Sequence, residues 1–226
     1  MEKWINLCFC IDESGSMYPS MEDVIGGFQS IIDEQKKNNE GKVTVSLYKF
    51  NHVVTEVYRG VDVNDIEKFD YHPDGCTALY VGVGVAIDDI GKWLHERDEN
   101  GEQMPDKTLM VVMTDGYENS SKEYTLEGIQ ERIKRQTDVY SWEFVYVGTD
   151  LSTKKPATSM GFSNQVYNTR SKMKKGYDMI NWVTSAYRNF AGSTADAALS
   201  LKKTLCTESL KSVAEYEADT GKKLED

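Results

Sequence analysis

The chain has 226 residues, of which 39% are hydrophobic and 28% charged, and these proportions indicate a globular protein with a substantial core. Its formal net charge of −11 at pH 7 argues against non-specific binding to nucleic acid, because the phosphate backbone would repel it. The sequence has no apolar run of about 18 residues, so we expect no transmembrane helix and no membrane partner. No small-residue cleavage site follows the first apolar stretch, and we expect a cytoplasmic protein.

An apolar run at residues 5–11 ends abruptly in a group of oxygen donors. The run is too short for an independent helix and suits a strand that is buried on both faces of a parallel sheet. Asp12, Ser14 and Ser16 follow it at alternating positions. One carboxylate and two hydroxyls can supply half of the shell of a hard divalent cation, which prefers oxygen ligands. Taken alone, the same three residues also fit a turn and an N-cap for the helix that follows.

The next segments predict a helix and a hairpin. Apolar residues recur at helical spacing from Met17 to Lys37, which predicts an amphipathic helix. Val43 to Phe50 and Val53 to Tyr58 predict two antiparallel strands, joined by a turn at Asn51 and His52. We expect this hairpin at the edge of the sheet.

Helices and strands alternate along the rest of the chain. This order predicts one mostly parallel sheet that is covered by helices on both faces. Residues 191–226 are predicted to form a short C-terminal helical extension. The remaining predicted elements are helices at 79–95, 124–136, 151–163 and 171–190, and strands at 108–114, 141–147 and 165–167.

Two further loops bring oxygen donors to the edge of the sheet that holds Asp12, Ser14 and Ser16. Thr77 lies at the start of the second long helix, and Asp115 ends the strand from 108 to 114. The carboxyl ends of such strands are neighbours in a doubly wound sheet. Mg²⁺ takes octahedral oxygen shells at about 2.0–2.1 Å and usually keeps several waters. Two carboxylates and three hydroxyls suit this ion and leave a position open for a carboxylate of another molecule.

Three segments of the sequence resemble the motif segments of von Willebrand factor A (VWA) domains. They are Asp-Glu-Ser-Gly-Ser-Met at 12–17, Gly-Cys-Thr-Ala-Leu-Tyr at 75–80 and Thr-Asp-Gly-Tyr-Glu-Asn-Ser at 114–120. In that family the segments build a metal-ion-dependent adhesion site, with the pattern D-x-S-x-S, T, D. All five positions are matched in order, by Asp12, Ser14, Ser16, Thr77 and Asp115. The resemblance covers roughly residues 3–190.

The resemblance carries expectations about fold, cofactor and partner. It implies a Rossmann-like, doubly wound α/β fold, with a mostly parallel sheet of about six strands, one antiparallel edge strand and helices on both faces. It implies a VWA-like domain at 1–190, followed by the extension at 191–226. It also implies a Mg²⁺ or Mn²⁺ ion that binds an Asp or Glu of a partner protein, in a stand-alone protein of the bacterial or phage type.

Several polar groups lie near these motifs without matching a motif position. Glu13 and Glu118 are expected to be solvated acids on loops. Cys76 stands where glycine is common in the family, and we expect it to be a bystander. The other cysteines show no metal spacing, which indicates a reducing compartment.

The segment 150–175 is basic within an otherwise acidic chain. Lys154, Lys155 and Arg170 in this segment could flank the ion and attract an acidic segment of the partner. The alternative is that they form a solvated face with no role in binding.

The leading functional hypothesis is a metal-dependent binding module and not an enzyme. The alternative is a metal-dependent phosphohydrolase on a similar sheet, as in haloacid-dehalogenase-like enzymes. Those enzymes require an Asp-x-Asp motif, and here Ser14 occupies the third position. A third hypothesis is that the ion is only structural. The sequence leaves the partner and the choice between Mg²⁺ and Mn²⁺ open.

Overall fold

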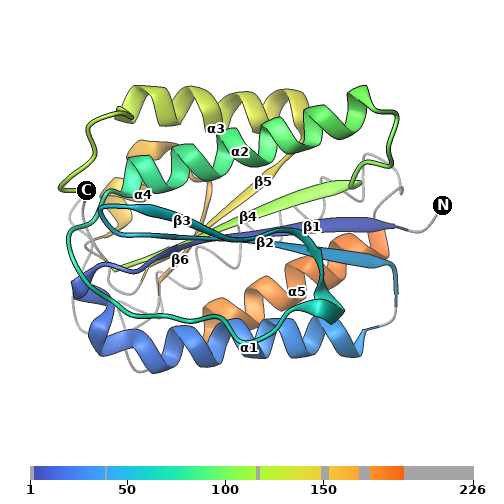
Figure 1. The fold of residues 1–226 in the computed structure, drawn as a ribbon, viewed down its shortest axis with the longest axis horizontal. Helices are drawn as coiled ribbons and strands as arrows, with labels where there is room; N and C mark the ends of the chain where they lie inside the picture. Colours follow the sequence, from blue (N-terminus) through green and yellow to red (C-terminus); the bar gives the residue numbers. More distant parts are fainter. Residues whose placement is uncertain (1–2, 39, 116–117, 149–152, 168–173, 191–226) are drawn as a thin grey trace.

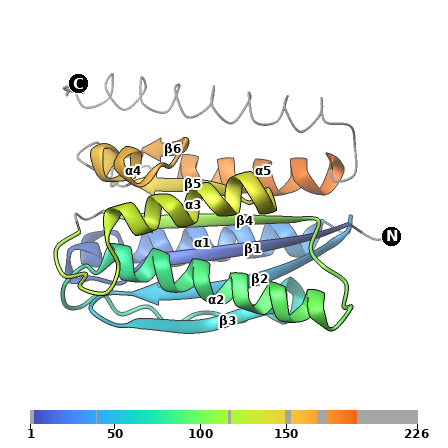
Figure 2. The ribbon, with the colours of Figure 1, turned by 90° about the horizontal axis from the view of Figure 1, so that it is seen from above.

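The computed structural model describes residues 3–38, 40–115, 118–148, 153–167 and 174–190. Within these ranges, six strands form one sheet in the order β3-β2-β1-β4-β5-β6, which can be followed in Figure 2. β3 pairs antiparallel with β2 at one edge, and every other neighbouring pair is parallel. The predicted sheet with one antiparallel edge strand is therefore confirmed. The strands are β1 (Trp4–Asp12), β2 (Lys42–Phe50), β3 (Val54–Asp62), β4 (Lys107–Thr114), β5 (Glu143–Gly148) and β6 (Asn164–Tyr167).

Helices cover both faces of this sheet (Figure 1). The lower face in the figure carries α1 and α5, and the upper face carries α2 and α3. Crossovers between parallel strands are almost always right-handed, and those that lead to β2 and to β5 run toward opposite edges of the sheet, so α1 and α3 lie on opposite faces. The α-helices are α1 (Met21–Lys37), α2 (Leu79–Glu99), α3 (Leu126–Tyr140), α4 (Lys154–Met160) and α5 (Lys174–Phe190), and short 3₁₀ turns lie at Gly15–Ser20 and Val63–Asp65.

β1 lies at the centre of the sheet and is buried at every position. Ile5, Leu7 and Phe9 pack into the core under α1 and α5. Cys8 and Cys10 pack into the second core, under α2 and α3, and carry free thiols. Burial on both faces explains why this segment reads as a continuous apolar run and not as an alternating one.

The structure moves some predicted boundaries. The helix expected from Met17 begins at Met21, and the preceding 3₁₀ turn contains Pro19, whose fixed backbone suits the first turn of a helix. The strand expected to end at Tyr58 continues to Asp62. The predicted extension at 191–226 lies outside the described residues. No helix in the described ranges is both long and apolar enough to cross a membrane.

Contact between α1 and α5 depends on a glycine. A Cβ atom at Gly27 would lie 1.9 Å from the ring of Tyr177, so only glycine leaves room for this side chain of α5. The adjacent Gly26 has no atom within 4 Å of the corresponding position. Gly27 is therefore in close contact with α5, whereas its neighbour Gly26 is not, and the two positions can be compared by the same substitution.

We predict opposite effects of alanine at these two positions. Gly27→Ala should lower the free energy of unfolding by about 1–3 kcal/mol, because the ring of Tyr177 must move. Gly26→Ala should raise it by about 0.5–1 kcal/mol, because alanine favours the helix. Urea denaturation measures both values, and equal effects of the two substitutions would contradict this account of the α1–α5 contact.

Candidate functional site

The carboxyl ends of β1 and β4 bring four of the five predicted ligands together. Asp12 ends β1, and Asp115 follows the last residue of β4. The Ser16 hydroxyl donates a hydrogen bond to Asp115 Oδ1 at 2.7 Å, and the hydroxyl oxygens of Ser14 and Ser16 lie 3.1 Å apart. The backbone N–H of Ser14 donates to Asp12 Oδ1 at 2.8 Å. The structure therefore brings four of the five predicted ligands into one cluster, as expected from the topology of the sheet.

Thr77 lies in the adjoining loop, which packs against the first motif through the backbone. Gly15 N donates to Gly75 O at 3.1 Å, and Asp74 N donates to Glu13 O at 2.8 Å. Thr77 itself is 3% exposed. Its described hydrogen bonds are made by its backbone, so the structure places Thr77 beside the cluster without showing a bond from its side chain to the other four residues.

The loop after β4 holds the Thr77 loop in place. Thr77 N donates to the side-chain oxygen of Asn119 at 3.0 Å, and Asn119 N donates back to Thr77 O at 3.1 Å. This reciprocal pair joins the second and third motifs. Sequence reasoning missed Asn119, because an asparagine in a loop gives no signal of the segment that it will contact.

Glu118 caps a helix that has no capping residue of its own. α2 follows Ala78, whose side chain cannot accept a hydrogen bond, so the first N–H groups of the helix need other partners. Tyr80 N donates to Glu118 Oε2 at 2.9 Å, and Ser121 N donates to Glu118 Oε1 at 2.6 Å. A carboxylate is also favoured at a helix N-terminus by the helix dipole. The prediction that Glu118 is solvated is therefore wrong.

The same prediction is wrong for Glu13. Its side chain is 13% exposed and pairs with Lys49 at 2.9 Å. His72 N also donates to its Oε1 at 2.7 Å. Beside this pair, the hydroxyl of Tyr71 donates to the backbone oxygen of Asp12. Glu13 thus helps to fasten the loop at 70–72 against the end of β1.

The electrostatic state of Asp12 is unusual for a carboxylate. Its side chain is 0% exposed, and this burial raises its pKa to about 6, with a smaller raising contribution from the charge of Asp115. Hydrogen bonds from Thr114 and Ser14 oppose the shift. Burying a charged carboxylate is unfavourable unless a partner compensates it. A cation at this position would provide such compensation.

The donor set fits a hard cation and does not suit a softer one. Within the described residues, no three His, Cys, Asp or Glu side chains converge as a metal site. A cation here would rely on serine and threonine hydroxyls, two carboxylates and ligands from outside the chain. Oxygen donors of this kind suit Mg²⁺ and Mn²⁺, whereas Zn²⁺ prefers histidine and cysteine.

Two of the three basic residues that we singled out lie toward the same edge. α4 begins at Lys154 and follows the carboxyl end of β5, near the strand ends at the left of Figure 1. Lys155 is exposed on the first turn of this helix. Separately, Cys76 is exposed in the loop that carries Thr77. Arg170 lies outside the described residues.

Comparison with known proteins identifies the fold. No protein-family model matches the sequence, and no curated protein matches it significantly. The PilB minor pilin of Streptococcus sanguinis is 12% identical with a TM-score of 0.58, and the match covers 84% of this chain and 62% of the pilin. The manganese-loaded TRAP protein of Plasmodium vivax is 18% identical with a TM-score of 0.52, and 79% of this chain matches 72% of that chain.

A third neighbour is described as a von Willebrand factor domain. It belongs to the type V pilus tip protein Mfa5 of Porphyromonas gingivalis, with 11% identity, a TM-score of 0.55, and coverage of 82% of this chain and 96% of that domain. Together with the strand order, these likenesses show that the chain has a VWA fold. At such low identity, they show the fold alone.

We predict that Asp12→Asn stabilises the metal-free protein at neutral pH. Because the pKa of Asp12 is raised, burial of its charged form lowers the free energy of unfolding above pH 6. This loss of stability is absent below about pH 4, where the carboxyl is protonated in both the folded and the unfolded chain. Asparagine removes the charge and still accepts the hydrogen bond from Ser14. The gain in unfolding free energy should be about 1–3 kcal/mol at pH 7.5 and should vanish near pH 4.

Urea denaturation in EDTA at both pH values measures this gain. Asp65→Asn, which removes an exposed acid, serves as the control. A gain from Asp12→Asn that does not change with pH would show that Asp12 is not a buried charge.

Removal of Glu118 should loosen the start of α2 and the loop after β4. Glu118→Ala leaves several backbone N–H groups without their acceptor, and we expect a loss of about 1–3 kcal/mol in unfolding free energy. Amide hydrogen exchange at Tyr80 and Ser121 should speed up in the same variant. Glu123→Ala removes an exposed acid from the same loop and should change neither quantity. Unchanged exchange in Glu118→Ala would refute the capping role.

Proposed function

We propose that this protein is a divalent-metal-dependent protein-binding module. A Mg²⁺ or Mn²⁺ ion at the carboxyl edge of the sheet would supply a compact positive charge for an Asp or Glu of a partner protein. The observation that carries the proposal is the cluster of Asp12, Ser14, Ser16 and Asp115 oxygens at that edge. The proposed ligands are Asp12, Ser14, Ser16, Thr77 and Asp115.

Burial divides these ligands into an inner and an outer set. Asp12 and Ser14 are 0% and 1% exposed, whereas Ser16 is exposed and Asp115 partly so. The inner residues are suited to hold an ion, and the outer residues leave its solvent side open. A carboxylate from another molecule can approach from that side only.

Apolar side chains near the cluster favour a protein as the partner. Tyr18, two residues after Ser16, is 69% exposed, and Val53 in the β2–β3 turn is 57% exposed. The turn is tied to the Thr77 loop, because Ala78 N donates to Asn51 O at 2.8 Å. A tyrosine with an exposed ring is a common anchor of protein interfaces. A free carboxylate or phosphate ion would make no use of such groups.

The charge of the surroundings suggests how an acidic partner approaches. The whole chain carries a net charge of −11, which repels acidic proteins at a distance. Lys154, Lys155 and Arg170 would lower this repulsion locally and steer an acidic segment of the partner. This part of the proposal rests on the position of α4 and on the sequence of the basic segment.

Two further considerations support a binding module. Asp12 is fully buried and engaged by Ser14 and Thr114, so it is poorly placed to attack a substrate as the nucleophile of a phosphohydrolase would. One protein of the same fold was solved with manganese bound, and two others belong to pili. We also propose a cytoplasmic location, because Cys8, Cys10 and Cys76 form no disulfide within the part of the chain that the structure describes.

The proposal predicts metal binding that depends on the outer carboxylate. Asp115→Ala should weaken Mn²⁺ binding by at least about ten-fold, because the shell loses one of its two charges. Asp70→Ala, which removes an exposed acid outside the cluster, should leave the affinity unchanged. Isothermal titration with Mn²⁺ and with Mg²⁺ measures both effects.

Capture from extracts of the native host tests the partner. A protein retained in Mg²⁺, released by EDTA and absent from the Asp115→Ala bait would support the proposal. Retention that survives both EDTA and the substitution would place the partner site elsewhere. Mg²⁺-dependent release of phosphate from a generic ester, lost in Asp12→Ala, would favour the phosphohydrolase instead.

A further inference from the structure

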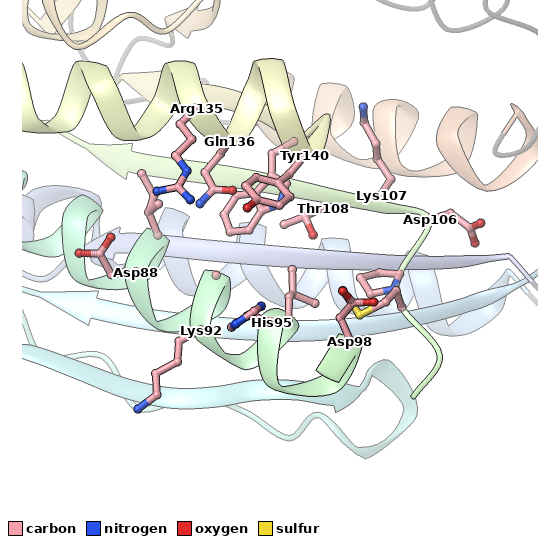
Figure 3. Close-up of a pocket in the computed structure, with 16 residues that line it drawn as sticks. Asp88, Lys92, His95, Asp98, Asp106, Lys107, Thr108, Arg135, Gln136 and Tyr140 are labelled. Atoms are coloured by element: carbon pink, nitrogen blue, oxygen red, sulfur yellow. The ribbon is translucent and has the colours of Figure 1, made fainter. Parts of the chain in front are cut away.

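A cleft at the opposite end of the sheet lies between the C-terminal halves of α2 and α3 (Figure 3). Its volume is about 570 Å³, and small-molecule sites usually measure about 300–1,000 Å³. Thr108 and Trp142, which line it, lie at the amino ends of β4 and β5, whereas the metal cluster lies at the carboxyl ends. The cleft is therefore separate from the proposed binding edge.

One wall of the cleft is aromatic. Tyr140 ends α3 and is 54% exposed, and its ring hangs into the cleft above Thr108 in Figure 3. Ser141 then adopts a left-handed conformation with φ 57°, and this turn lets Trp142 N donate to Gln136 O at 3.0 Å. Trp142, which is 3% exposed and packs in the core under α2 and α3, also lines the cleft and is the second aromatic group of the wall. Such a surface favours a flat aromatic ligand.

The charged groups of the cleft are mostly paired. Asp88 accepts from Arg132 at 2.9 Å, and Lys107 pairs with Glu143 at 3.1 Å. The exposed Lys92 and His95 face acids one turn further along α2, at 3.8 and 3.4 Å. Asp106 accepts from the backbone N–H of Trp4 at 2.7 Å. These contacts balance most of the local charge.

Arg135 is different from these groups. It extends from α3 over the cleft in Figure 3 and forms no ion pair within the described part of the chain. Asp98 lies at the far end of the cleft from Arg135 in the same view. The guanidinium is thus available for an anion, to which it can donate two parallel hydrogen bonds.

Behind the floor of the cleft lies a buried polar side chain of β1. Thr108 is paired in register with Asn6 of β1, which is 0% exposed. The side-chain oxygen of Asn6 accepts from Thr44 and Ser46 on β2, at 3.2 and 3.3 Å, and the amide nitrogen is the other polar atom of this side chain. This nitrogen has no hydrogen-bond partner among the described residues. Asn6 does not itself line the cleft, so the polar group of the floor that a ligand can reach is Thr108.

We propose that this cleft binds a small aromatic acid. The ring would lie against Tyr140 and Trp142, the acid group would meet Arg135, and an oxygen at the other end of the ring would face the floor at Thr108. Arg135 and Tyr140 come from α3 and Thr108 from β4, and the fold brings these two elements together at the cleft. The proposal does not depend on metal binding at the opposite edge.

A larger side chain at Gly91 would fill the cleft with little disturbance of the surrounding residues. Gly91 lies on α2 and lines the cleft, and a Cβ atom there would meet only the end of the Gln136 side chain, at 3.4 Å. Leucine at this position would fill the cleft, and alanine would leave most of it open. Both substitutions replace a glycine inside a helix and should favour folding.

The test uses the full chain and the fluorescent probe 6-hydroxy-2-naphthoate, with its neutral amide as the comparison compound. EDTA is present throughout, so that a metal ion at the other edge cannot hold the probe through its carboxylate. We expect wild type and Gly91→Ala to bind the acid equally, and Gly91→Leu to bind it at least about ten-fold more weakly. Arg135→Gln should weaken binding of the acid by about five-fold and leave binding of the amide within about two-fold.

Three results would overturn the proposal. One is the absence of saturable binding of either probe by the wild-type chain. Another is equal binding by Gly91→Leu and wild type, which would place the probe elsewhere on the molecule. The third is an equal loss of acid and amide in Arg135→Gln, which would show that the site does not select an anion.

Discussion

The burial of one carboxylate at the end of the central strand is the constraint on which the rest of the site depends. β1 is buried along its whole length, and Asp12 is its last residue. Neighbouring groups donate hydrogen bonds to this buried residue. Thr114 and the Ser14 backbone donate to its carboxylate, and the Tyr71 hydroxyl donates to its backbone oxygen. The bonds from Thr114 and Ser14 offset only part of the cost of burying the carboxylate, because the pKa of Asp12 remains raised. A bound cation would offset more, and it would do so where Ser16 and Asp115 open the cluster to solvent.

The loops that carry the other proposed ligands are held by one another. α2 cannot cap itself at Ala78, and the loop after β4 supplies the missing acceptors through Glu118. Asn119 links the same loop to Thr77 in both directions. The position of Thr77 therefore depends on residues that follow the third motif. A substitution in that loop should disturb the second motif even though the two are about 40 residues apart in sequence.

Much of the fold could be predicted because its signals are local. The apolar run of β1, the helical spacing of α1 and the hairpin pattern each depend on neighbours in sequence. The clustering of Asp12 and Asp115 followed from topology alone. The roles of Glu13 and Glu118 could not be predicted, since Lys49 and His72, which donate to Glu13, and Tyr80, which donates to Glu118, lie 36 to 59 residues away in sequence. The cleft at Arg135 could not be predicted for the same reason, because its lining comes from α2, β4, α3 and the loops beside them.

The central claim is that the carboxyl edge of the sheet holds a divalent ion with a position left open. Anomalous diffraction from crystals of the protein grown with Mn²⁺ tests it most directly. The account predicts one manganese peak among the oxygens of Asp12, Ser14, Ser16, Thr77 and Asp115, with water or an outside carboxylate completing its shell. A structure with no manganese at this edge, or with manganese enclosed by protein ligands alone, would contradict it.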